Sequence, residues 1–98
     1  MKKHDWSKPD DIVACFVYKY SEKDIGLSQK EIAHRLGISE ASLQMRVANF
    51  QALDGNGGLK NASRLSREVF SQYWNISKEA FLKKVKQILQ KFLWPEAA

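Results

Sequence analysis

The sequence has only one cysteine, two prolines and two histidines among 98 residues, and each shortage excludes a class of protein. Cys15 cannot form an intramolecular disulfide, so we expect a core held by packing and a reducing, cytoplasmic setting. No run approaches the roughly 18 apolar residues of a membrane-spanning helix, and the first residues lack the apolar segment of a secretory signal. We therefore expect a single globular domain over residues 1–98 without membrane contact.

Acidic residues are scarce in the second half of the chain, and this scarcity produces the whole net charge of +5. Residues 1–55 hold eight Lys or Arg and eight Asp or Glu, whereas residues 56–98 hold eight and three. The net charge is therefore zero in the first half and +5 in the second. Such an excess favours a polyanionic partner, whose charged contacts must come from the second half.

Strand-like alternation is absent, and helical periods with clear start and stop signals predict an all-α fold. Ser28 and Glu31 form the sequence pattern of a capping box, and Gly37 ends the same helix. Ser7, Ser39, Ser63 and Ser77 are predicted to precede other helices. The predicted segments are a three-helix core over 6–54, a glycine-rich loop over 55–63 and a two-helix extension over 64–94.

The second and third predicted helices have the spacing of a helix-turn-helix. Ala33, a small residue, lets two helices cross closely, and Gly37 takes the positive φ of the turn. In the next helix Leu43, Val47 and Phe50 form one inward stripe. The pattern favours a helix-turn-helix, with a plain αα-hairpin as the alternative.

Several motifs add a family resemblance. They are Trp6-Ser7, Asp10-Asp11, residues 31–37 (EIAHRLG) and residues 39–50 (SEASLQMRVANF). Together they resemble a Myb/SANT-type three-helix domain. Residues 42–54 and 58–70 are similar to the amino-terminal module found ahead of HNH nuclease domains in bacterial restriction-like endonucleases, and this similarity covers about residues 5–75.

The resemblance implies a DNA-associated role without the nuclease. An HNH nuclease needs a metal-binding core with histidines and usually cysteine pairs, whereas this chain has His4, His34 and Cys15. We expect His34 to be solvated and Cys15 to be packed in the core. The sequence therefore predicts no catalytic residue, metal or cofactor. The expected protein is a small DNA-binding regulator or accessory of a mobile-element or defence system in a bacterium or phage. The alternative is a SANT-type adaptor that binds another protein.

Helix geometry selects the candidate base-reading residues. At about 100° per residue, the inward stripe of the third helix leaves a small, uncharged outer face. Amide, hydroxyl and methyl groups on such a face can contact base edges in the major groove. The candidates are Ser42, Gln44, Met45 and Asn49. Met45 has an alternative, in which the segment 57–70 folds back and covers it.

Phosphate contacts need positive charge or helix N-termini. The candidates are Ser39, Arg46, Lys60, Asn61, Arg64 and Arg67. For Arg46 the alternative is an ion pair with a carboxylate such as Asp54. For the segment 60–67 the alternative is a solvated, basic helix start.

The last predicted helix combines an apolar stripe with a lysine-rich face. The stripe consists of Phe81, Val85, Ile88 and Phe92, which are too apolar to remain in water. It is expected to complete the core or to form the seam of a homodimer, whereas the lysines could lie along DNA. The partners expected are double-stranded DNA and a second copy of the chain, with no small-molecule substrate.

Overall fold

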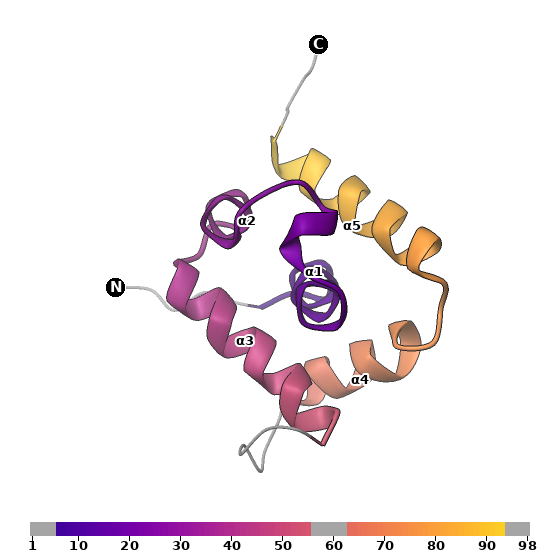
Figure 1. The fold of residues 1–98 in the computed structure, drawn as a ribbon. Helices are drawn as coiled ribbons and strands as arrows, with labels where there is room; N and C mark the ends of the chain where they lie inside the picture. The colour runs from indigo at the N-terminus through magenta and orange to yellow at the C-terminus, as the bar shows by residue number, and fades with distance from the viewer. Residues whose placement is uncertain (1–5, 56–62, 94–98) are drawn as a thin grey trace.

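The structure is a computed structural model that describes residues 6–55 and 63–93. The described part is helical throughout, as predicted (Figure 1). Its elements are α1 (Lys8–Lys19), the short 3-10 helix η1 (Glu22–Asp24), α2 (Gln29–Leu36), α3 (Glu40–Leu53), α4 (Arg64–Tyr73) and α5 (Lys78–Leu93). The candidate residues Lys60 and Asn61 and the side chain of Phe92 lie outside the described part.

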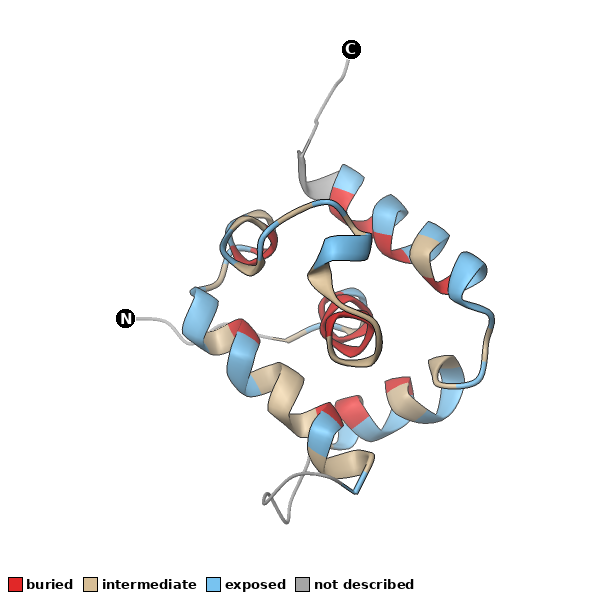
Figure 2. Ribbon diagram, viewed as in Figure 1, coloured by how far each residue is buried: buried red, intermediate tan, exposed pale blue. Residues whose placement is uncertain are grey.

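Helix α1 occupies the centre of the fold, and the other four helices surround it (Figure 1). Its side chains from Asp10 to Val17 are all buried, so α1 is enclosed on every side rather than along one stripe (Figure 2). The core around α1 includes Ile32 of α2, Leu43 of α3 and Val69 of α4. Helices α3, α4 and α5 pack directly on α1, whereas α2 packs mainly on α3 and α5, and the five helices share one core.

Serine caps start the helices, as the sequence predicted. Each cap hydroxyl accepts a hydrogen bond from the backbone N–H three residues later, at Ser7, Ser28, Ser39, Ser63 and Ser77. The reciprocal capping box forms at Ser7 and Asp10, where the Asp10 carboxylate accepts from the Ser7 N–H. Glu31 does not complete the box predicted for it, because its carboxylate pairs with Arg35.

The apolar stripe of α5 belongs to the core of its own chain. Phe81, Val85 and Ile88 are buried, and the ring of Phe81 meets that of Phe16 edge to face with 5.1 Å between centroids. Packing within the core is therefore confirmed for these three side chains. They are not available for the alternative, a seam between two copies, because they are already buried in the core of their own chain.

Candidate nucleic-acid interface

A tight glycine turn joins α2 to α3. Gly37 has φ +79°, the left-handed conformation predicted for it, and its N–H donates to the carbonyl of His34. The N–H of Ile38 donates to the carbonyl of Ala33 at 3.0 Å, so the carbonyls of Ala33 and His34 at the end of α2 are satisfied. Ala33 is buried where α2 packs. Helix α3 then begins after only three residues.

Helix α3 has one buried and one open face. Leu43 and Phe50 are fully buried, whereas Gln44 is exposed and Met45 is 71% exposed. The alternative for Met45 was that the segment 57–70 covers it. The described part of this segment, residues 63–70, leaves Met45 exposed. Most residues of the outer face are uncharged, and Glu40 is the exposed charged residue of α3.

The other two candidate base-reading residues lie on a flank of α3. Ser42 and Asn49 are half-buried, and Ser42 shares the cap of the helix with Ser39, whose hydroxyl donates to the Ser42 hydroxyl at 3.0 Å. Asn49 lies one turn after Arg46 and therefore on the same flank. Arg46 reaches α1 from this flank, so Asn49 is only partly open to a partner.

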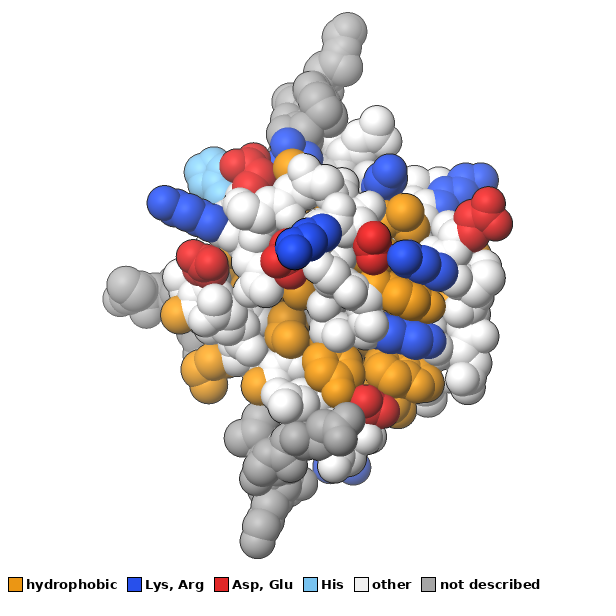
Figure 3. Space-filling view, viewed as in Figure 1, with side chains coloured by type: hydrophobic (Ala, Val, Ile, Leu, Met, Phe, Trp, Pro, Cys, Tyr) orange, Lys and Arg blue, Asp and Glu red, His pale blue; other side chains and the backbone are white. Residues whose placement is uncertain are grey.

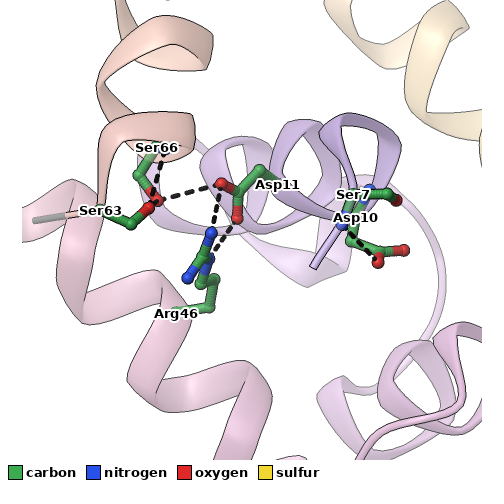
Figure 4. Close-up of polar contacts among 6 residues, drawn as sticks. All are labelled: Ser7, Asp10, Asp11, Arg46, Ser63 and Ser66. Atoms are coloured by element: carbon green, nitrogen blue, oxygen red, sulfur yellow. Dashed lines mark hydrogen bonds and ion pairs between the residues drawn. The ribbon is translucent and has the colours of Figure 1, made fainter. Parts of the chain in front are cut away.

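A buried ion pair connects α1, α3 and α4 behind this flank (Figure 4). The guanidinium of Arg46 donates two hydrogen bonds to the Asp11 carboxylate, with Nε to Oδ1 at 2.5 Å and Nη2 to Oδ2 at 2.9 Å. The hydroxyl of Ser66 donates to the same Oδ2 at 3.0 Å. The ring of Trp6 lies 4.6 Å from the guanidinium carbon and covers it. Asp11 is completely buried, so its charge depends on these partners.

This ion pair corrects the prediction for Arg46. The side chain is 13% exposed and faces Asp11 instead of solvent, which removes it from the phosphate contacts. The predicted alternative, an ion pair with a carboxylate, is what the structure shows, but the partner is Asp11 rather than Asp54, whose carboxylate accepts a hydrogen bond from the Tyr18 hydroxyl at 2.8 Å. Asp11 lies in the first turn of α1, where an acidic residue usually serves as a helix-start charge. Its position four residues before the packed Cys15 places it on a buried stripe, and this was the signal available in the sequence.

Exposed cations flank α3 on the next helix. Arg64 and Arg67 are exposed in the first turn of α4, the helix whose Ser66 is tied to Asp11. The hydrogen bond chain from Ser66 through Asp11 to Arg46 thus fixes the start of α4 beside α3. Ser39, another phosphate candidate, is exposed, but its hydroxyl already accepts from the Ser42 N–H at 3.0 Å.

In residues 6–55 and 63–93 no three His, Cys, Asp or Glu side chains are grouped to hold a metal ion. Burial raises the pKa of the Cys15 thiol to about 12, so it stays protonated and unreactive at neutral pH. Across the same residues no helix has the length and apolar character needed to cross a membrane.

A shallow hollow lies between α2 and α5, away from the open face of α3. It has a volume of about 370 Å³ and is lined by Ile25, Leu27, Arg35, Lys86, Leu89 and Gln90. The lining is an apolar floor with two cations and contains no carboxylate, histidine or thiol. This hollow therefore offers no acid or base for catalysis other than the lysine amine.

Comparison with models of protein families, with curated proteins and with solved structures found no match to the chain. The resemblance to Myb/SANT-type modules therefore stays a prediction from the motifs. The geometry of α2, α3 and α4 is the basis on which a function can be argued.

Proposed function

We propose that this chain is a non-enzymatic DNA-binding protein in which α2 and α3 act as a helix-turn-helix. The observation that carries the proposal is the open face of α3, which presents Gln44 and Met45 directly after the tight turn at Gly37. A glutamine amide can form two hydrogen bonds with adenine, and a methionine can contact the thymine methyl group. In this role the protein is a small regulator or accessory factor, as the family resemblance implies.

Phosphate affinity has to come from outside α3. Helix α3 has one arginine and one glutamate, and the arginine is neutralised by Asp11. Binding to DNA depends on cations that displace counterions from phosphates. Arg64 and Arg67 are the exposed cations that the buried ion pair fixes beside α3. We propose that they contact the backbone while the open face of α3 lies in the major groove.

Charge reversal at the start of α4 tests this division of roles. For Arg64→Glu combined with Arg67→Glu we expect duplex affinity to fall at least about tenfold at low salt, because two phosphate contacts become repulsive. The slope of log K against log salt should decrease by about 2 between about 50 and 200 mM salt. Fluorescence anisotropy with a labelled mixed-sequence duplex measures both quantities.

Two matched variants complete this experiment. Arg64→Lys with Arg67→Lys keeps the charge and should keep the salt slope. Gln44→Ala removes a proposed base contact and should leave the salt slope unchanged, while discrimination between duplex sequences weakens by about 1–3 kcal/mol. An unchanged affinity in the charge-reversed variant would remove Arg64 and Arg67 from the interface.

A second candidate function is supported by Met45. Methionine adapts to many apolar partners, and on this face its side chain is 71% exposed. An uncharged face with one exposed methionine also suits a protein-binding adaptor. The salt titration separates the two functions, since a wild-type chain that binds no duplex at about 50 mM salt supports the adaptor and contradicts the DNA-binding proposal.

A further inference from the structure

The outer face of α5 is the most basic helical surface of the chain. Its sequence has five lysines and one glutamate, a net charge of +4. Lys83, Lys84 and Lys86 are exposed, while Val85 between them and Phe81, about one turn before Val85, are fully buried. The core contacts of α5 therefore hold these lysines toward solvent. We refer to Lys83, Lys84 and Lys86 as the α5 basic face.

No carboxylate neutralises this face within the part of the chain that the structure describes. Lys78, at the start of α5, pairs with Asp24 at 3.1 Å, but the three lysines of the α5 basic face form no ion pair with a described residue. Three unpaired ammonium groups within two helical turns repel one another and attract mobile anions. A polyanion that replaces those anions gains affinity from their release.

The α5 basic face and the open face of α3 point in opposite directions. Helices α3 and α5 lie on opposite sides of α1, each with its apolar side toward α1 (Figure 1). Leu43 and Phe50 of α3 and Phe81 of α5 point inward, so Gln44 and Lys83 project outward on opposite sides. In Figure 3 the α3 side, at lower left, is mostly orange and white, whereas most blue side chains lie above and to the right.

One DNA duplex cannot contact both faces. The chain has a radius of gyration of only 12.9 Å, so a duplex lying in contact with α3 would have to reverse its direction around α1 to reach α5. Smooth bending of a short duplex already costs free energy, and a reversal of its direction costs more. Three lysine contacts are too few to offset such a bend as well as the entropy of ordering their side chains.

We infer that the α5 basic face binds the phosphate backbone of a second DNA duplex, so that one copy of the chain bridges two duplexes. This inference rests on the proposed function of α3, but it adds a second surface and a different activity. The α5 basic face contributes charge without base-reading groups, so the second duplex is bound independently of its sequence.

A capture experiment tests the bridge. A biotinylated duplex is fixed to beads, the full chain is added at about 50 mM salt, and retention of a second, fluorescent duplex is measured. We expect the wild-type chain to retain the second duplex. The variant Lys83→Glu, Lys84→Glu, Lys86→Glu should retain at least about tenfold less, because three favourable phosphate contacts become repulsive. Arginine at the same three positions should preserve capture.

The control measurements assign each outcome. Circular dichroism melting should give the same Tm for both α5 variants, since the three side chains are exposed. If the wild type binds the first duplex and captures no second one, the inference is wrong while the proposed function stands. If the charge-reversed α5 variant bridges as well as the wild type, the bridge comes from a homodimer and the inference is again wrong. If no duplex binds at all, the proposed function itself fails.

Discussion

Replacing Asp11 by alanine is expected to lower the free energy of unfolding by about 3–5 kcal/mol, because it leaves the buried Arg46 guanidinium without its carboxylate. Arg46 is 13% exposed and donates two hydrogen bonds to the Asp11 carboxylate, so solvent can restore little of the loss. Ser66 loses its acceptor in the same variant. A loss of this size is a large part of the stability of a small domain. Urea denaturation followed by circular dichroism measures it.

A surface ion pair provides the matched control. Glu31 and Arg35 are also an acidic and a basic residue, at 3.2 Å, but the Glu31 side chain is 45% exposed. Glu31→Ala should cost only about 0.2–0.5 kcal/mol, as is usual for exposed pairs four residues apart on a helix. Equal losses for Asp11→Ala and Glu31→Ala would contradict the account of the buried cluster. The double variant Asp11→Leu with Arg46→Met should recover most of the stability, since no buried charge is then unpaired.

Replacing Phe81 by alanine is expected to cost about 3–5 kcal/mol. The ring is fully buried, and its centroid lies 5.1 Å from that of Phe16 and 5.5 Å from that of Tyr73. Its removal leaves a cavity among α1, α4 and α5. Urea denaturation of this variant tests whether α5 belongs to the core or is an appendage.

Met45→Ala is the control for the loss of a large side chain. Met45 is 71% exposed, so its truncation should change the free energy of unfolding by less than about 0.5 kcal/mol. If Phe81→Ala were as mild as Met45→Ala, α5 would not be part of the folding unit. The α5 basic face would then not be held on the side opposite to α3, and one duplex could contact both faces.

Local features of the fold could be predicted from the sequence because they depend on residues a few positions apart. Serine caps, the glycine turn at Gly37 and the apolar stripes of α3 and α5 were all predictable in this way. The central position of α1 could not be predicted in this way. The helical period of its apolar residues indicates a broad stripe, and only the packing of α3, α4 and α5 reveals that the helix is enclosed on all sides.

The residues of the candidate interface could be predicted where their position depends on the helical period. The prediction failed where a side chain pairs with a residue far away in the sequence. The outward direction of Gln44 and Met45 follows from helix period alone, and both are exposed. Arg46 and Asp11 are 35 residues apart, and Tyr18 and Asp54 are 36 apart, so no periodicity relates them. The charge distribution had indicated that base and phosphate contacts come from different parts of the chain. The structure adds that the two basic helices of the second half, α4 and α5, occupy different sides of α1 (Figure 1).

The most direct test of the proposed DNA-binding surface is an NMR titration of the full-length, nitrogen-15-labelled chain with a short mixed-sequence duplex at low ionic strength. The account predicts that the earliest and largest amide shifts occur at Gln44, Met45 and neighbouring residues of α3 and at Arg64 and Arg67 of α4. Amides of α5 should respond separately, as the second duplex is bound. A duplex that shifts α5 alone, or that shifts no amide of α3, would contradict the claim that α3 binds DNA.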